Sequence, residues 1–202
     1  MIRNFAGTTL TDIFLKKLNK LNKDYDVFFA GHEKIFQKKC EVNQIPFVQR
    51  NELSTIIDEP AAKIYHFLKE QKYDYFLQVN ACMPFLKVET IKNFLLLCKK
   101  IKNHCFSVFK INNYFLSKEN KPYNFKKNLL TINTKNVQYV KEFAHALYFF
   151  KKDYFVKNGW YWNWNKLKYI NIPKNLETLD IDTEQDFILA EKIWKSVNKF
   201  SK

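Results

Sequence analysis

The order of strand-like and helical patterns along this chain predicts an α/β domain with a mostly parallel sheet and helices on both faces. Short apolar runs typical of buried strands alternate with amphipathic helical spacing from the start of the chain. The chain has 202 residues, of which 47% are hydrophobic and 17% aromatic, so it can bury one sizeable core but not two. We therefore expect a single domain over residues 1–202.

The first half of the chain carries the clearest alternation. The predicted strands share short runs of apolar residues and lie at 26–30, 45–48, 75–79 and 105–111. The predicted helices share apolar residues at three- and four-residue intervals and begin near residues 10, 35, 60 and 91. Thr11-Asp12 suits a helix N-terminus, and Pro60 suits the first turn of a helix that carries Ile64, Phe67 and Leu68.

The second half is less regular. Residues 112–128 contain few large aliphatic side chains and predict an excursion from the core, whereas 129–132 and 146–150 are strand-like. Residues 159–164 include three tryptophans, which predict a packed or interface edge, with base stacking as the alternative. A helix is expected from Thr183 to about Lys199, where Thr183 and Asp186 resemble a capping box.

The formal net charge of +14 raises the question of nucleic-acid binding. The lysines occur as doublets along the whole chain, which suits solvated helix faces or attraction for small phosphorylated substrates. No apolar run has the length of a membrane span and no leader pattern is recognisable, so we expect a cytoplasmic protein. The four cysteines form no CxxC pair and are expected to be buried free thiols.

Two segments could carry chemistry. Asn80 follows the predicted strand at 75–79, where ligands gather in open α/β sheets, and its amide could read a base edge or orient a phosphate. Asparagine at a strand exit is also ordinary turn chemistry. The chain has only three glycines, so it offers no Gly-rich phosphate loop, and its four histidines are isolated from one another in sequence.

The second segment is Asp180-Ile181-Asp182, just ahead of the last predicted helix. In an extended segment, residues two apart project to one side, with their Cα atoms roughly 6–7 Å apart. Two carboxylates placed in this way can share one Mg²⁺, whose remaining ligands are water and substrate phosphates. The alternative is that acidic residues stabilise the positive end of the following helix without any ligand.

Taken in order, these features resemble the acylneuraminate cytidylyltransferase family, which activates sialic-acid-type sugars with CTP. The stretches that carry the resemblance span nearly the whole chain and lie at residues 3–10, 49–54, 73–86 and 179–191. The last is the most specific, because it follows the family's closing pattern D-I-D-T-x-x-D-(hydrophobic)-x-x-A-E. Residues 112–164 match only loosely.

The resemblance implies a Rossmann-like, three-layer nucleotidyltransferase fold and transfer of CMP from CTP to a 2-keto-3-deoxy sugar acid of the sialic, legionaminic or pseudaminic type. Asp180 and Asp182 would hold Mg²⁺, while Asn80 and Arg50 would contact the nucleotide. The sugar hydroxyl would attack the α-phosphorus and release pyrophosphate. The resemblance also implies a homodimer, with residues 112–164 as a dimerisation excursion, and neither a membrane nor a nucleic acid as partner.

Three departures from the family pattern leave alternatives open. Asn80 stands in place of a glutamine, and His32 stands where an acidic residue is usual. The family's first strand and the R-x-G-S-K-R loop that grips CTP are not found in this sequence. Either Met1 is not the true start or catalysis has been lost, and a catalytically inactive relative that serves as a binding or assembly partner is the first alternative function. A basic nucleic-acid-binding module is the second.

Overall fold

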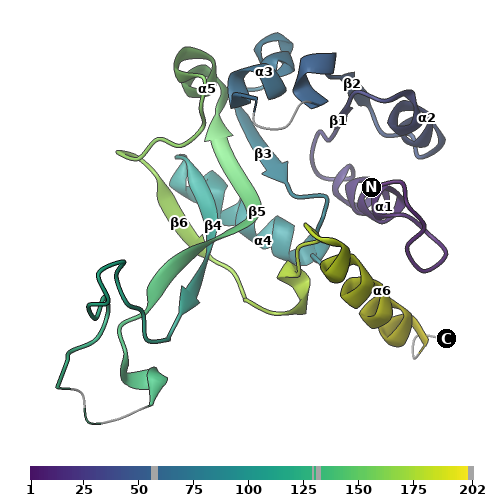
Figure 1. Cartoon of the computed structure of the whole chain (residues 1–202). Coiled ribbons are helices and arrows are strands. Elements are labelled where there is room, and N and C mark those ends of the chain that lie inside the picture. The colour runs from purple at the N-terminus through teal and green to yellow at the C-terminus, as the bar shows by residue number, and fades with distance from the viewer. Residues whose placement is uncertain (56–58, 129, 131–132, 200–202) are drawn as a thin grey trace.

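The computed structural model describes residues 1–55, 59–128, 130 and 133–199, and Figure 1 shows their arrangement. The helices are α1 (Leu10–Leu21), α2 (Lys34–Val42), α3 (Ala61–Ile64), α4 (Val88–Ile101), α5 (Lys152–Asn158) and α6 (Glu184–Lys199). The strands are β1 (Phe29–Gly31), β2 (Phe47–Gln49), β3 (Tyr75–Val79), β4 (Cys105–Ile111), β5 (Val140–Lys151) and β6 (Lys168–Asn171). Short 3₁₀ turns are η1 (Glu52–Thr55), η2 (His66–Glu70), η3 (Thr134–Asn136) and η4 (Leu176–Thr178).

The described strands form two sheets. Strands β1 and β2 pair in parallel, and the second sheet has the order β3-β5-β4-β6. β5 is antiparallel to both of its neighbours, whereas β4 and β6 are parallel, so β3, β4 and β6 run in one direction. The predicted α/β class is confirmed, and the sheet contains the expected parallel elements together with one long reversed strand.

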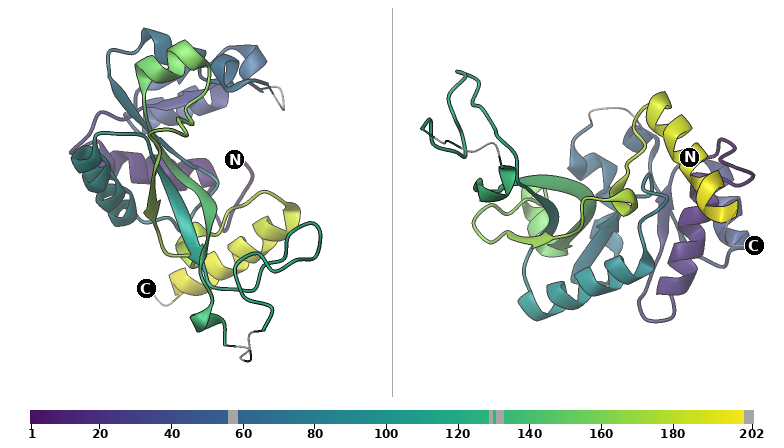
Figure 2. Two further views of the ribbon diagram at one scale, coloured as in Figure 1. Left: turned by 90° about the vertical axis from the view of Figure 1, so that its left-hand side faces the viewer. Right: turned by 90° about the horizontal axis from the view of Figure 1, so that it is seen from below.

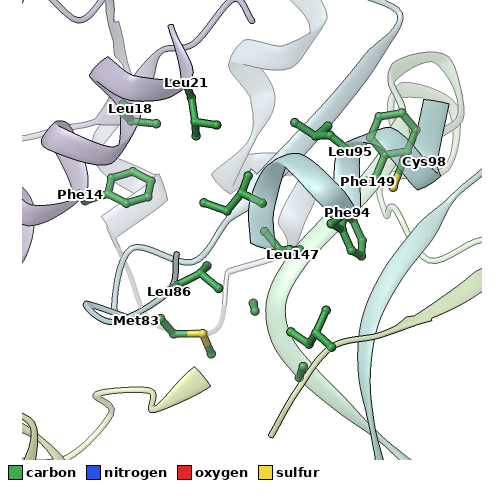
Figure 3. Packing of buried hydrophobic residues seen from close by; sticks show 14 of the residues in the cluster. Phe14, Leu18, Leu21, Met83, Leu86, Phe94, Leu95, Cys98, Leu147 and Phe149 are labelled. Carbon is green, nitrogen blue, oxygen red and sulfur yellow. The ribbon is translucent and has the colours of Figure 1, made fainter. Parts of the chain in front are cut away.

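The two sheets separate the hydrophobic core into layers on their opposite faces. On one face, α1 and α4 cover β1 and β3 through Phe14, Leu18, Leu95 and Cys98, and Figure 3 shows α1 and α4 side chains of this cluster facing one another. On the other face, an aromatic layer surrounds Phe106 and Phe155 and includes residues of η2, α5 and β5. A third cluster joins the N-terminal segment to α6 and holds residues 179–181 in place.

Local sequence explains the helix ends, with two adjustments to the predictions. Helix α1 begins at Leu10, near the predicted start, and its cap is Thr9 rather than Thr11, because the Thr9 hydroxyl accepts from the Asp12 N–H at 3.1 Å. The helix predicted from Pro60 is interrupted at Tyr65 and continues as the 3₁₀ turn η2. This break allows Tyr65 and Phe67 to pack into the same aromatic layer, with ring centroids 6.3 Å apart.

Residues 112–139 leave the body of the domain, and the described part projects away from the sheet in Figures 1 and 2. It contains η3 and an isolated bridge between Leu116 and Pro122. Most of the strand predicted at 129–132 lies outside the described residues. The rest of the predicted dimerisation excursion belongs to the body of the domain. Strand β5 lies between β3 and β4 in its sheet, and the Trp162 ring stacks on the Phe143 ring with centroids 4.8 Å apart.

The structure also bears on the predicted burial of the cysteines and on membrane-spanning helices. Cys40, Cys98 and Cys105 are buried free thiols as predicted, whereas Cys82 is only partly buried. Over the described ranges, no helix combines the length and the apolar character needed to cross a membrane.

Candidate functional site

The candidate site lies where the loop after β3 meets the segment ahead of α6. The Asn80 N–H donates to the carbonyl of Ala146 on β5 at 2.9 Å, which continues the strand pairing by one residue. The Asn80 Oδ1 then accepts from the Cys82 N–H at 2.8 Å and closes a tight turn. The Ile181 N–H donates to the Cys82 carbonyl at 3.2 Å, so this turn fixes the backbone between the two aspartates.

Asp180 is half-buried and is held from two sides. Its Oδ2 accepts from Asn80 Nδ2 at 2.9 Å, and its Oδ1 accepts from the Ile181 N–H at 3.0 Å. Burial raises the pKa of Asp180, and the negative charge of Asp182 raises that pKa further. The structure therefore holds the Asp180 carboxylate partly out of water and next to a second carboxylate. A bound cation would offset both the lost hydration and the repulsion between the two negative charges.

Asp182 lies on the solvent side of the same segment. Its side chain is exposed and accepts no hydrogen bond from the described residues. Behind it, the Thr183 N–H donates to Asp186 Oδ2 at 2.8 Å, and the Asp186 N–H donates to the Thr183 hydroxyl at 3.2 Å. This reciprocal pair is the predicted capping box. Because Thr183 and Asp186 together cap α6, Asp182 is not needed for that purpose.

The two aspartates offer a small set of oxygen donors to a metal ion. Within the described residues there is no group of three or more His, Cys, Asp or Glu side chains that could hold a metal ion. Mg²⁺ does not need such a cage, because it is commonly bound by one or two carboxylates with water and substrate phosphates as further ligands. Asp180 and Asp182 fit that requirement, and they do not fit a structural zinc or calcium site.

Two residues of β5 interact electrostatically with Asp180 and were not found by sequence reasoning. His145 has a positive φ of 51°, and its Nδ1 is hydrogen-bonded to the hydroxyl of Tyr148. The charge of His145 lowers the pKa of Asp180 against the two effects that raise it. The pKa of Tyr148 is raised mainly by burial, with a further contribution from the charge of Asp180. Both residues therefore act on the Asp180 carboxylate electrostatically.

The position of His145 follows from an irregularity in the sheet. The register between β4 and β5 shifts between Phe106 and Val108. Phe106 pairs with Tyr148 and Val108 pairs with Phe143, so β5 has extra residues opposite this part of β4. Such bulges turn side chains out of the ladder and are frequent beside functional sites. His145 lies in no sequence motif that could have marked it, because the bulge arises from pairing with a distant strand.

Arg50 lies in another part of the domain. Its N–H donates to the carbonyl of Gly31 at 2.7 Å, so it follows the pairing of β1 and β2. Its guanidinium Nε donates to the Ser54 hydroxyl at 3.0 Å, and its Nη2 donates to the Ser54 carbonyl. The structure therefore joins Asn80, Asp180 and Asp182 but gives Arg50 a local role in holding η1. Its predicted contact with nucleotide stays a prediction.

Three of the four stretches that suggested a family are brought together. The guanidinium of Arg3 pairs with the Glu184 carboxylate, with one N–O distance of 2.9 Å, and the Ala6 N–H donates to Glu191 at 2.8 Å. Between them, Phe5 is fully buried and packs edge-on against Phe187, with ring centroids 5.4 Å apart. The N-terminal segment thus clamps α6 and, through it, the two aspartates.

Comparison with known proteins identifies the fold. No protein-family model and no curated protein sequence matches this chain. Among solved structures, 4-diphosphocytidyl-2C-methyl-D-erythritol synthase from Anaerococcus prevotii DSM 20548 aligns with a TM-score of 0.66 at 12% identity, covering 95% of this chain and 91% of that one. CMP:2-keto-3-deoxy-manno-octonic acid synthetase complexed with CTP also aligns with a TM-score of 0.66, at 7% identity, covering 96% and 91%.

At these identities the likeness establishes the fold alone. The predicted Rossmann-like nucleotidyltransferase fold is confirmed, and this chain shares it with both solved structures. Neither likeness singles out the acylneuraminate family. The substrate and the reaction of this chain therefore depend on the chemistry of its own site.

Proposed function

We propose that this domain is a cytidylyltransferase that uses CTP and a 2-keto-3-deoxy sugar acid, transfers CMP to the sugar hydroxyl and releases pyrophosphate. The observation that carries the proposal is the half-buried Asp180, oriented by Asn80 and adjoined by the exposed Asp182, at the end of β3 where α/β sheets bind ligands. The fold is consistent with this, because one solved structure of the same fold is complexed with CTP.

Each side chain has a proposed part. Asp180 and Asp182 would hold Mg²⁺, which supplies charge neutralisation for the triphosphate and for the transition state. Both ends of the Asn80 amide are engaged by protein groups, so we assign Asn80 the role of orienting the Asp180 carboxylate. In the step itself, the sugar hydroxyl gives up its proton to solvent and its oxygen bonds to the α-phosphorus, the bond from that phosphorus to the bridging oxygen breaks, and pyrophosphate leaves.

A non-catalytic nucleotide-binding domain is the second candidate. The observation that favours it is the scarcity of glycine: Gly7, Gly31 and Gly159 are the only three in the sequence, and they form no backbone cradle for the β- and γ-phosphates. Under this alternative the aspartates bind a metal–nucleotide complex without turnover. Nucleotide binding and pyrophosphate release would then separate experimentally.

The test is a pyrophosphate-release assay with CTP, Mg²⁺ and a panel of 2-keto-3-deoxy sugar acids, with UTP and ATP as parallel nucleotides. Release that requires both CTP and a sugar acid, and that is lost in Asp182→Asn, supports transfer. The matched control is Asp153→Asn, which removes an exposed carboxylate remote in sequence from the site and is expected to retain full activity. CTP binding without pyrophosphate release favours the second candidate. The absence of both CTP binding and pyrophosphate release would refute both candidates.

A further inference from the structure

A small cavity lies at the end of the sheet opposite the two aspartates. Its volume is about 310 Å³, which is at the lower end of the range for small-molecule sites. Its lining comes from the ends of α4 and β5, the starts of β3 and β4, α5 and the turn before β6. It includes three lysines and three further polar side chains: Lys102, Lys151, Lys166, His104, Tyr154 and Asn163. We call this cavity the lysine pocket.

The strand pairing explains why these residues meet. Tyr75 pairs with Lys151 where β3 begins and β5 ends, and Cys105 at the start of β4 pairs with Lys168 at the start of β6. Residues next to these positions therefore gather at one edge of the sheet. Asn80 follows the other end of β3, roughly 17 Å along the strand from Tyr75. Figure 1 accordingly shows α5 and α6 at opposite ends of the sheet, so the lysine pocket is separate from the aspartate site.

The buried part of the lysine pocket is polar. His104 is 4% exposed and Asn163 is 9% exposed. The His104 Nδ1 donates to the Tyr161 carbonyl at 3.0 Å, so a ligand of this ring has to use Nε2. The Asn163 side-chain amide has no hydrogen-bond partner among the residues that the structure describes. Buried polar side chains are normally paired, so an amide of this kind in a cavity wall points to a ligand.

Backbone hydrogen bonds fix the positions of these side chains. The Lys166 N–H donates to the Asn163 carbonyl at 3.0 Å and closes the turn that carries both residues. The Lys168 N–H donates to the His104 carbonyl at 2.8 Å, which joins this turn to the start of β4. The His104 ring packs edge-on against the Tyr154 ring, with centroids 4.8 Å apart. The pocket is therefore preorganised, which lowers the entropic cost of binding a ligand.

The exposed part of the lysine pocket is positively charged. Lys102, Lys151 and Lys166 are exposed and come from three separate segments. Within the described ranges, Lys151 is the one of the three that forms an ion pair, with the Asp153 carboxylate at 3.6 Å. Both partners of that pair are exposed, so it is weak. Three positive charges around one small cavity repel one another, and a compact anion would offset that repulsion.

The arrangement of the charges favours a compact phosphate over a nucleic acid. A nucleic-acid backbone requires a positive groove that follows successive phosphates. Here the lysines surround one cavity, and the buried Asn163 amide offers N–H donors to a single group inside it. Hydrogen bonds from charged donors to phosphate oxygens are among the strong ones in proteins. The rings of Tyr75 and Tyr154 also line the cavity and offer apolar surface to a small organic group.

We propose that the lysine pocket binds the phosphate group of a small phosphomonoester. Its three lysines neutralise the charge of the phosphate, and the Asn163 amide and the His104 ring donate hydrogen bonds to the phosphate oxygens. The carbon skeleton of the ligand lies against the two tyrosines. The proposal does not depend on the proposed enzymatic activity, because the pocket is remote from the aspartates and its binding is measured without CTP or a sugar acid.

Binding at this pocket should be coupled to protonation of His104. Because Nδ1 is held by the Tyr161 carbonyl, the ring donates to a ligand through Nε2 only when it is protonated. Burial lowers the pKa of His104, the hydrogen bond to Tyr161 offsets part of this, and the charge of Lys166 lowers the pKa further. The other charged groups of the pocket are Lys102 and the Lys151–Asp153 pair. A bound anion adds a negative charge beside the ring, so it should raise the pKa of His104.

Calorimetry and NMR titration of the full chain with inorganic phosphate and with glycerol 3-phosphate test the proposal. Both ligands should bind saturably and shift the amide resonances of His104 and Lys166, whereas chloride at equal ionic strength should not. Replacing Lys102 and Lys166 together by methionine should weaken binding by about tenfold or more. The matched control replaces Lys20 and Lys23, which lie outside the pocket lining, and should bind as wild type. Glycerol 3-phosphate should bind more tightly than inorganic phosphate, because its carbon chain contacts the tyrosines.

Sulfate provides the test of the coupling to His104. It keeps two negative charges over the range of about pH 5 to 8 in which histidine titrates, so a pH dependence of its binding reports on the protein. Saturating sulfate should raise the pKa of His104, followed at the ring by NMR in the wild-type chain, and His104→Gln should abolish the pH dependence of sulfate binding.

Several results would overturn the proposal. The absence of saturation by about 50 mM phosphate, or equal weakening in the Lys20 and Lys23 control, would show that the pocket is not an anion site. Tighter binding of inorganic phosphate than of glycerol 3-phosphate would overturn the assignment to a phosphomonoester. An unchanged pKa of His104 in saturating sulfate would overturn its role as a donor.

Discussion

Replacing Asn80 and Asp180 by alanine, singly and together, tests whether their hydrogen bond organises the site. Asn80 Nδ2 donates to Asp180 Oδ2 at 2.9 Å between positions 100 residues apart in sequence. A double-mutant cycle isolates the energy of this pair, provided that each single change removes the interaction without creating another.

The coupling energy depends on the charge and the exposure of this hydrogen bond. A hydrogen bond to a charged group contributes about 1.5–3 kcal/mol, and the partial exposure of Asp180 reduces this, so a coupling of about 1–2 kcal/mol is expected. Asn80→Ala also removes the acceptor of the Cys82 N–H, for about 1 kcal/mol more. That second loss belongs to Asn80 alone and cancels from the coupling.

The assay is urea unfolding of the four proteins at neutral pH, analysed by linear extrapolation. The control cycle pairs Asp180→Ala with Asn158→Ala, because Asn158 Nδ2 bonds to the Tyr154 carbonyl at 2.8 Å in a different part of the domain. The control cycle should be additive. A coupling between Asn80 and Asp180 below about 0.3 kcal/mol would mean that their hydrogen bond does not organise the site, because independent sites scatter by that much.

Three further predictions follow from buried or exposed side chains. Burial lowers the pKa of Lys17 to about 8 from an ordinary value of 10.5. Between these two pH values the folded protein binds fewer protons than the unfolded chain, so its free energy of unfolding should rise with pH, by up to about 3 kcal/mol. Urea titrations should show that this rise disappears in Lys17→Met but not in Lys20→Met. Phe5→Ala should cost about 3–5 kcal/mol in the free energy of unfolding, whereas Tyr123→Ala, at an exposed position, should stay within about 0.5 kcal/mol; equal effects would contradict the clamp on α6. If residues 112–164 supply a dimer contact, Trp164→Ala should weaken a dimer seen by sedimentation, and a wild-type monomer at high micromolar concentration would rule this out.

The fold was most predictable where local pattern and tertiary environment agree. The strands β3 and β4 have the predicted bounds because each is a short apolar run between breakers, covered on both faces. The reversed direction of β5 was not predictable, because an apolar pattern carries no information on strand direction. The predicted third helix failed at Tyr65, where packing into the aromatic layer prevails over helical propensity.

The site shows the same division. The i, i+2 spacing marked Asp180 and Asp182, and a turn after an apolar strand marked Asn80, but their meeting depends on the folded sheet. His145 could not be recognised, since its position depends on a bulge created by the register of β4 against β5. Site residues that belong to a local sequence motif can thus be predicted from the sequence. Site residues whose position depends on strand register cannot.

We propose that Asp180 and Asp182 jointly hold Mg²⁺ together with nucleotide, and calorimetric titration of CTP with and without Mg²⁺ measures this binding. Wild-type protein should bind CTP more tightly when Mg²⁺ is present, and Asp180→Asn or Asp182→Asn should reduce that gain by about tenfold or more, with the unfolding midpoint nearly unchanged in Asp182→Asn. Asp153→Asn should behave as wild type. Metal-dependent binding that is unaltered in both Asp180→Asn and Asp182→Asn would contradict the account.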